Sequence, residues 1–405
     1  MTICRGIIYH KISDDLLNLC KSLYCKLNDK KKIKNFEIRF KRFNNSKYCL
    51  TYPFARSAFL SILKTDKNIR PGDEIILSSI QIKGMLDVIV SLKLKPVIVD
   101  IEPNTLNFDL KDLKKKITKK TKVVLLTYLY GIVPNLDKIL NIIKKKKIIL
   151  VEDFSQCLGG MYKNKIVGNF GDFGIYSLSA TKTLDTYGGG ILVTNKKQFF
   201  KKNLIFHKNL KSKNRLFLIF KIFQSLYRNI FSKKILFYFI IKIFKFLNFF
   251  GYKNYSRFLG KRNTKILKFI PSLWFTSFTS LQAEFGSKLL NTVKFYNKKR
   301  ISNVMKIKEG VGKQFFPTID KDSFNVFWQL AFINKKSEKI RLFALSKNID
   351  IARPSIQLIS NILKTTRLKR SKNIYNNLIL IPSYHSLNAI EVSKIYSVIK
   401  KVCRK

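Results

Sequence analysis

Acidic residues are scarce in this sequence. Asp and Glu together number 24 among 405 residues, against 79 Lys and Arg, so the formal net charge is +55. Hydrophobic residues nevertheless make up 46% of the chain, which excludes a disordered protein because this much apolar surface offsets the entropy lost on folding. The charge points either to an anionic partner, such as nucleic acid or an acidic membrane surface, or to a lysine-rich background composition.

Cysteine and histidine are also few, with six and three residues. No two cysteines form a CxxC pair, so neither a zinc site nor a disulfide framework is expected. The histidines are too dispersed for a His-rich metal site or a local His-based catalytic motif. We therefore expect no metal and a reducing compartment. The first 15 residues contain no apolar run of signal-peptide length, so we expect a cytoplasmic location.

From residue 51 to about 200, short β-rich runs alternate with helical segments. The expected strands are Glu74–Leu77, Pro96–Val99, Val123–Thr127, Ile148–Val151, Gly174–Tyr176 and Gly190–Thr194. The expected helices are Arg56–Lys64, Ile82–Leu92, Leu110–Lys116 and Leu136–Lys144. Apolar runs such as VVLLT and IILVE are typical of parallel strands covered by helices on both faces. The order therefore predicts an α/β fold with an open, doubly wound sheet, in which ligands bind beyond the carboxyl ends of the strands.

Two of these carboxyl ends carry polar residues. The run IILVE leads into Asp153, and the run GIY leads into Ser177, with Lys182 five positions later. Each residue has an ordinary explanation when taken alone, as a helix cap, a turn residue and a surface lysine. Together they place a carboxylate, a hydroxyl and a lysine at one edge of one sheet. This edge is the predicted site.

A series of short motifs occurs along the sequence, both before and after the residues of the predicted site. They are PGDE (71–74), VDIEPNTL (99–106), Tyr130-Gly131 with Asn135-Leu136-Asp137, Glu152-Asp153 with Gln156, Gly168 with Gly171-Asp172, Ser177 with Lys182, YGGG (187–190) with VTN (193–195), LQA (281–283) and IPSY (381–384). This order resembles the DegT/DnrJ/EryC1/StrS family of sugar aminotransferases, over residues 51 to about 200 and again from about 271 to the C-terminus. The resemblance implies pyridoxal 5'-phosphate as cofactor. It also implies the type I aminotransferase fold, with a mostly parallel doubly wound sheet in a large domain and a small C-terminal α+β domain.

The resemblance assigns a role to each residue of the predicted site. Lys182 would hold the cofactor as a Schiff base and then move a proton, which a partly desolvated amine can do. Asp153 would pair with the ring nitrogen and keep it protonated. Gln156 would contact the hydroxyl side of the ring, and Ser177 would donate to the phosphate.

The phosphate would also meet Ala55, Arg56 and Ser57, which open a helix whose first amides can cradle an anion. Arg56 would add positive charge there. The family often has Gly-Thr or Gly-Ser at this cradle, and commonly an aromatic residue near Ile82 that stacks on the ring. It usually has an Asn and an Arg, reaching into the neighbouring subunit, where this chain has Phe275 and Ser277. These departures indicate a divergent branch with an unusual acceptor.

The expected organisation has four parts: an N-terminal segment (1–50), a large cofactor-binding domain (51–204), a basic amphipathic insert (205–270) and a small C-terminal domain (271–405). No acidic residue occurs between Asp185 and Glu284, and residues 205–270 hold 16 Lys and Arg and 17 Phe and Tyr. Residues 235–250, the most apolar run, would form a helix of about 24 Å, short for a hydrocarbon core of about 30 Å.

Two interpretations fit this basic aromatic helical insert. Lys242 and Lys245 are three positions apart and share a helical face, so the helix could lie in a membrane interface with both lysines toward anionic headgroups. Alternatively, the insert could be a helical subdomain that packs on the body or covers the active site. We favour the membrane surface, because burying this many unpaired lysines against protein would be costly.

No nucleic-acid partner is expected. The sequence shows no helix-turn-helix, RNP or KH pattern, and the insert is too apolar for a solvated phosphate-binding stripe. The resemblance implies an aminotransferase that converts a nucleotide-linked keto-sugar to an amino-sugar, with glutamate as amino donor, in a homodimer with sites at the subunit interface. Its product would enter a surface polysaccharide or lipopolysaccharide pathway, near the inner face of the cell membrane.

Two other functions remain as alternatives. One branch of the family uses this fold for sugar dehydration with His in place of the lysine, and Lys182 argues against it. The other is a catalytically silent membrane-surface scaffold or regulatory protein that retains the fold, which the altered cradle and interface residues motivate.

Overall fold

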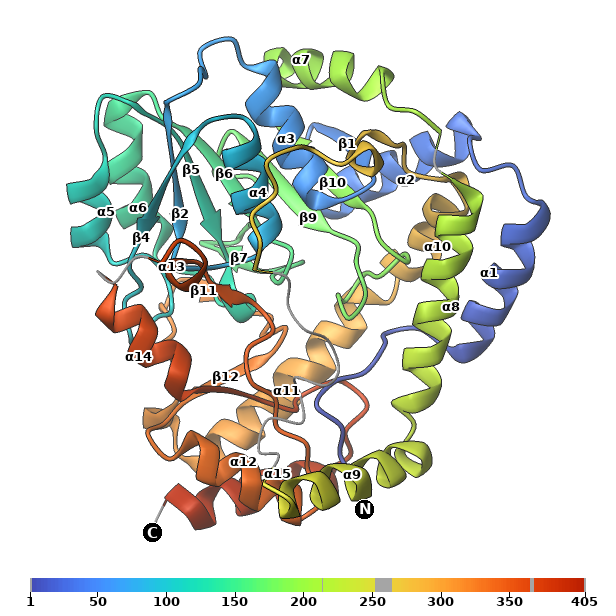
Figure 1. Cartoon of the computed structure of the whole chain (residues 1–405), viewed down its shortest axis with the longest axis vertical. Coiled ribbons are helices and arrows are strands. Elements are labelled where there is room, and N and C mark those ends of the chain that lie inside the picture. Colours follow the sequence, from blue (N-terminus) through green and yellow to red (C-terminus); the bar gives the residue numbers. More distant parts are fainter. Residues whose placement is uncertain (1, 213, 252–263, 365–367, 404–405) are drawn as a thin grey trace.

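A computed structural model describes residues 2–212, 214–251, 264–364 and 368–403 (Figure 1). Its strands are β1 Tyr48–Tyr52, β2 Glu74–Ser78, β3 Ile80–Gln81, β4 Lys95–Val99, β5 Thr121–Thr127, β6 Ile149–Asp153, β7 Met161–Tyr162, β8 Lys165–Ile166, β9 Phe173–Ser177, β10 Gly190–Thr194, β11 Ser323–Phe324, β12 Leu330–Ile333, β13 Gln357–Leu358 and β14 Leu378–Ile381. Its α-helices are α1 Ile12–Tyr24, α2 Lys30–Phe43, α3 Ala55–Thr65, α4 Lys83–Ser91, α5 Leu110–Lys116, α6 Leu136–Ile143, α7 Lys197–Lys208, α8 Arg215–Phe231, α9 Lys234–Phe249, α10 Ser280–Leu290, α11 Val293–Val311, α12 Ser337–Ser346, α13 Ile359–Ile362, α14 Lys369–Asn377 and α15 Ala389–Cys403.

The main sheet has seven strands in the order β1-β10-β9-β6-β5-β2-β4. β4, β2, β5, β6 and β9 run parallel, and β10 is antiparallel to both of its neighbours. All six strands expected from the sequence are present, with ends within two residues, and the predicted doubly wound sheet is confirmed. β1 was not expected, because its short polar-apolar mixture YCLTY gives no strong strand signal.

Helices cover the main sheet on both faces, as its apolar strands require. On one face, α3 and α4 enclose a hydrophobic cluster with the sheet that includes Phe59 and Met85, and α7 packs at its margin. On the other face, α2, α5, α6 and α10 contribute Phe36, Leu113, Ile139 and Leu281 to a second cluster. The sheet is therefore buried on both sides, and its strand ends are the places where polar side chains can meet.

A second hydrophobic body lies beyond the carboxyl ends of the sheet (Figure 1). It is built from the antiparallel pair β12-β14 together with α11, α12, α14 and α15. Residues from the start of the chain join it, since Ile3 bridges to Ile349. This body is the predicted small α+β domain of the fold. The residue boundaries proposed for the four parts of the chain stay a prediction.

The predicted insert is helical where the structure describes it. α8 packs along α1 and adds Leu218 and Ile222 to the core cluster of the main sheet, whereas α9 packs against α12 in the second body (Figure 1). On α9, Ile241 and Phe244 are buried against Leu345. Residues 252–263 of the insert lie outside the described residues. No helix in the described ranges is both long and apolar enough to cross a bilayer.

The sequence-based prediction for Lys245 is wrong. Its ammonium group donates to the carbonyl oxygen of Ser346 at 3.1 Å and to Asn348 Oδ1 at 2.7 Å, so it faces the protein body and not a lipid surface. Lys242 is exposed, with its Nζ 4.9 Å from the ring centroid of Tyr238. Three positions along a helix correspond to 300°, and here that offset separates the inner side of α9 from its outer side.

Candidate active site

Strand register brings the predicted site residues to one edge of the main sheet. Asp153 ends β6 and lies opposite Ile175 of β9, two residues before Ser177 ends β9. Ser177 lies opposite Gly190, the first residue of β10, and Gly190 lies opposite Tyr52, the last residue of β1. Three residues after β1, Ala55 begins α3. The carboxylate, the hydroxyl and the helix N-terminus thus meet where the parallel strands end.

Lys182 lies in the loop between β9 and β10, close to this edge. Its side chain is buried, and its Nζ lies 3.8 Å from the ring centroid of Trp328. Burial lowers the pKa of Lys182 to about 8, although the negative charge of Asp153 acts in the opposite direction. The indole Nε1 of Trp328 donates to the carbonyl oxygen of Thr181 at 2.8 Å, which fixes the ring beside the lysine.

Asp153 is 1% exposed, and burial raises the pKa of its carboxyl group. Two interactions oppose that shift: hydrogen bonds from Ser155, whose amide donates to Asp153 Oδ1 at 3.1 Å, and the positive charge of Lys182. A buried carboxylate is stable only with a cationic or hydrogen-bonding partner. Asp153 therefore suits a protonated nitrogen placed above the sheet edge.

Glu152 and Gln156 hold the backbone around the site. The Glu152 carboxylate accepts from the hydroxyl of Tyr128 and from three amides of the following hairpin, those of Gly168, Phe170 and Gly171, at 2.5–2.7 Å. Gln156 is buried, and its Oε1 accepts from the amide of Tyr130 at 2.7 Å. Glu152 therefore stabilises the hairpin, and Gln156 stabilises the loop that follows β5.

The predicted phosphate cradle contains buried polar atoms. Within the described residues, Ser57 Oγ and Arg56 Nε have no hydrogen-bond partner. The Arg56 guanidinium lies 4.0 Å from the ring centroid of Phe54 and 4.9 Å from that of Trp274. Burial lowers the pKa of Arg56 to about 10, opposed by the charge of Asp87. A buried hydroxyl and a partly buried cation at a helix N-terminus fit an anionic group.

A glycine lets the start of β10 approach this cradle closely. A Cβ built on Gly190 would lie 2.2 Å from the backbone carbon of Phe54, so no side chain fits at this position. The turn before Gly190 is held by α10, because Gln282 Nε2 donates to the carbonyl oxygens of Thr186 and Gly188 at 2.9 and 2.7 Å. The LQA motif therefore positions the Gly-rich turn.

Two residues of this site were not identified from the sequence. Arg300 on α11 is fully buried and donates to Thr183 Oγ1 at 3.2 Å and to the carbonyl oxygen of Val326 at 2.8 Å. It thereby ties the lysine loop to the segment that carries Trp328. The spacing of the buried face of α11 could have identified it; that face includes Val293, Asn297, Arg300, Val304, Ile307 and Val311. For Trp328 the sequence offers no comparable signal.

The positions that depart from the family pattern pack within this chain. Ile82 precedes α4 and packs at the margin of the second body. Phe275 packs on Phe206, with their ring centroids 6.0 Å apart. The amide of Ser277 donates to the carbonyl oxygen of Lys211, at the start of the insert. Residues 275–277 thus lie along the insert.

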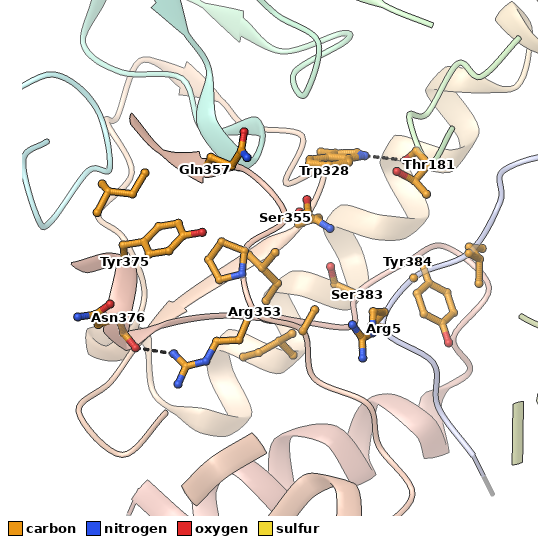
Figure 2. A pocket seen from close by; sticks show the side chains of 18 of the residues that line it. Arg5, Thr181, Trp328, Arg353, Ser355, Gln357, Tyr375, Asn376, Ser383 and Tyr384 are labelled. Atoms are coloured by element: carbon orange, nitrogen blue, oxygen red, sulfur yellow. Dashed lines mark hydrogen bonds between the residues drawn. The ribbon is translucent and has the colours of Figure 1, made fainter. Parts of the chain in front are cut away.

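A cavity of about 1010 Å³ lies beside the lysine loop and is lined mainly by the second body, together with Thr181 of that loop. Figure 2 shows Trp328 and Thr181 at one side, with Arg5, Arg353 and Gln357 around the rest. Lys182 itself does not line the cavity, since the Trp328 ring covers its ammonium group. Arg5 pairs with Asp350 at 2.5 Å and Arg353 pairs with Glu338 at 2.7 Å, so both guanidinium groups are already held in place.

Comparison with known proteins agrees with this architecture. The profile of the DegT/DnrJ/EryC1/StrS aminotransferase family matches residues 13–216, half of the chain. The chain belongs to this family. GDP-perosamine synthase of Escherichia coli O157:H7 is 31% identical over 174 residues, which are 43% of this chain and 48% of that protein. GDP-4-keto-6-deoxy-D-mannose 3-dehydratase of Escherichia coli O55:H7 is 31% identical over 194 residues, which are 45% of this chain and 50% of that protein.

This DegT/DnrJ/EryC1/StrS protein spans about half the length of the curated relatives it matches. A solved structure, the sugar aminotransferase CalS13 from Micromonospora echinospora, aligns over 98% of each chain with a TM-score of 0.74 and 17% sequence identity. That likeness establishes the type I aminotransferase fold. The predicted family and fold class are thus both confirmed.

Proposed function

We propose that this protein is a pyridoxal-phosphate-dependent aminotransferase that converts a nucleotide-linked keto-sugar to an amino-sugar. The observation that carries the proposal is the placement of Lys182, buried beneath Trp328 at the sheet edge where Asp153 ends β6. Family membership supports the same reaction class. The full set of cofactor residues proposed is Ala55, Arg56, Ser57, Asp153, Gln156, Ser177 and Lys182, with Lys182 and Asp153 as the catalytic pair.

These residues divide the work at the site. Pyridoxal phosphate, when bound, supplies an electron sink that stabilises a carbanion. Lys182 attaches the cofactor and carries a proton at its Nζ, because an amine with a pKa of about 8 exchanges protons readily near neutral pH. The Asp153 carboxylate favours a protonated ring nitrogen. Trp328 covers the lysine and excludes water from it.

The phosphate would bind at the N-terminus of α3. Ser57 Oγ offers a buried hydroxyl that lacks a partner among the described residues, and Arg56 offers a cation. Ser177 lies at the same sheet edge, with its Oγ 2.9 Å from Ser179 Oγ. Gln156 would contact the cofactor ring from the loop side. Each of these roles is part of the proposal.

The cavity beside Trp328 is where we place the sugar nucleotide. Its lining combines aromatic and polar side chains with two arginines, which suits a sugar joined to a diphosphate. We further propose glutamate as amino donor, a homodimer with sites at the subunit interface, and a product used for surface polysaccharide or lipopolysaccharide. The cytoplasm is the proposed compartment, since it keeps thiols reduced and the six cysteines are free thiols within the described part of the chain.

Cofactor retention tests the proposal directly. Protein exposed to pyridoxal phosphate and then desalted should keep a visible absorption band. Lys182→Ala should lose the band, while Lys163→Ala, which changes an exposed lysine, should keep it. With a keto-sugar nucleotide and isotope-labelled glutamate, mass spectrometry should find the label in the sugar product.

The same experiment separates the other two functions. A wild-type protein that stays colourless after exposure to the cofactor would contradict the proposal and favour the silent scaffold. A coloured protein that consumes the sugar nucleotide without taking up labelled nitrogen would favour dehydration. The second case matters because one of the relatives is named as a dehydratase.

A further inference from the structure

α8 exposes large apolar side chains on the face opposite its core contacts. Leu218 and Ile222 are buried in the main core on its inner side. Its outer side carries side chains spaced three or four positions apart, all more than one third exposed: Leu216, Phe220, Phe223, Tyr227 and Phe231. This spacing aligns them along one helical face. α8 is therefore apolar on two sides, and only the inner one is covered by the described residues.

α9 repeats this arrangement. Ile241 and Phe244 are buried on its inner side against Leu345. The outer side exposes a second series at helical spacing: Ile235, Phe239, Ile243, Phe246 and Phe250. We call the exposed series of α8 and α9 together the outer apolar face. It contains ten large side chains, whereas isolated exposed apolar residues are common on monomers and need no partner.

Polar contacts hold both helices on the body in one orientation, so the same apolar side chains always face outward. On α8, Asn229 Nδ2 donates to Asp15 Oδ2 at 2.9 Å, and Ser225 lies 3.2 Å from His10 Nε2. On α9, Lys234 pairs with Glu391 at 2.7 Å, and Lys245 donates to Ser346 and Asn348. The inner faces are thus occupied, and the outer side chains cannot turn inward without breaking these contacts.

The charge around the outer apolar face indicates which kind of partner it binds. Both helices lack acidic residues, as does the whole stretch from residue 186 to 283. Arg228, Lys233 and Lys242 are exposed beside the apolar side chains. Two copies of the chain meeting through this face would bring like charges together, which opposes self-association. A surface with an apolar interior and anionic headgroups matches both properties.

We propose that the outer apolar face of α8 and α9 binds the surface of an anionic lipid bilayer. The two helices lie in the interface while their inner faces stay packed on the protein. Phe, Ile and Leu side chains enter the acyl boundary, and Lys242 extends its ammonium group toward the headgroups from among them. None of the side chains of this surface is among the proposed cofactor residues, and the proposal goes beyond the proposed reaction.

Vesicle flotation with the full-length protein tests this surface. Wild-type protein should float with vesicles of phosphatidylcholine and phosphatidylglycerol and much less with phosphatidylcholine alone, and salt should weaken binding. The double variants Phe220→Ser/Phe223→Ser on α8 and Phe239→Ser/Phe246→Ser on α9 should each reduce binding at least about tenfold. Phe295→Ser removes an equally exposed phenylalanine from α11 and should leave binding unchanged.

A reporter variant keeps the test independent of any folding defect. Both native tryptophans, Trp274 and Trp328, are buried. Phe246→Trp should therefore add a fluorophore that brominated phosphatidylcholine quenches when anionic vesicles are present. Failure of wild-type protein to float with anionic vesicles at low salt would overturn the proposal. Double variants that bind vesicles as wild-type protein does would also overturn it. So would a smaller molar mass by light scattering for the double variants than for wild-type protein, because that result would identify a second copy of the chain as the partner.

Discussion

At the scale of single residues, the site depends on a few side chains whose burial changes their chemistry. Lysine is abundant in this chain, but Lys182 differs from an ordinary surface lysine because it is only 5% exposed and lies against Trp328. Desolvation disfavours its charged form, and this makes the amine reactive. Asp153 partly restores that charge.

The pKa of Lys182 can be measured on the cofactor-free protein. Its rate of acylation by acetic anhydride, followed by peptide mass spectrometry, should rise with a midpoint near pH 8. Asp153→Asn should move the midpoint lower, because it removes the negative charge that raises the pKa of Lys182. Lys163 is the internal reference: its pKa is raised by Asp137, so it should react only at higher pH. A midpoint for Lys182 as high as that of Lys163 would contradict its burial.

Two serines on α3 should respond in opposite directions to removal of their hydroxyls. Ser57 Oγ has no partner among the described residues, so Ser57→Ala should raise the free energy of unfolding by about 1 kcal/mol and weaken cofactor retention. Ser61 Oγ donates to Asn203 Oδ1 at 2.7 Å and accepts from Tyr52. Ser61→Ala should therefore lower that free energy by about 1 kcal/mol. Urea denaturation measures the free energy of unfolding, and the visible absorption band measures cofactor retention. If Ser57→Ala were more stable than wild-type protein but retained the cofactor fully, Ser57 would not belong to the phosphate cradle.

The candidate site could be placed at one sheet edge from the sequence because its central residues end strands. Asp153 and Ser177 end neighbouring parallel strands, so their proximity follows from strand order alone. Trp328 lies 146 positions after Lys182 and belongs to the segment before β12. Local patterns contain no information about which distant segment packs on a loop. That contact needed the three-dimensional structure.

At the scale of elements, the insert shows what helical periodicity can and cannot decide. The sixteen residues 235–250, which are mostly apolar and aromatic and include two lysines, predicted a helix correctly. Which side of that helix faces the body depends on its packing partner, α12, which the sequence does not reveal. Lys245 was therefore assigned to the wrong side. β1 was missed for a related reason, because its stability comes from pairing with β10, 142 residues later.

The two sides of α8 should differ sharply in their contribution to stability. Ile222→Ala leaves a cavity in the main core and should lower the free energy of unfolding by about 2–5 kcal/mol. Phe223→Ala, one position along, removes an exposed side chain and should change it by less than about 0.5 kcal/mol. Urea unfolding of both variants measures the difference. Equal effects would mean that α8 does not belong to the core.

At the scale of the whole molecule, the net charge of +55 has two parts. Residues 186–283 supply 20 basic and no acidic residues, and the remaining excess is spread over the chain. This stretch, whose net charge per residue exceeds that of the rest of the chain, also carries the exposed apolar side chains of α8 and α9. The composition left an anionic partner and a lysine-rich background as alternatives, and the structure defines which side chains an anionic partner would meet.

In the absence of a bilayer, the outer apolar face and the cofactor site should act independently. Phe220→Ser/Phe223→Ser changes side chains that point away from the core, so it should retain the visible cofactor band and the rate measured with soluble substrates. Lys182→Ala should bind anionic vesicles as wild type does. Spectroscopy and flotation on the two variants measure this separation, and a loss of both properties in either variant would contradict it.

α8 and α9 connect the two hydrophobic bodies from outside, since α8 packs into the core of the main sheet and α9 onto α12. The two helices therefore link the two bodies mechanically. A bilayer bound along both helices would hold the two bodies in one orientation and oppose rotation of one body against the other. Because the cavity beside Trp328 is lined by the second body and by Thr181 of the lysine loop, attachment would also limit how far these two parts separate there. The same two helices would then govern both the location of the protein and the width of the cavity.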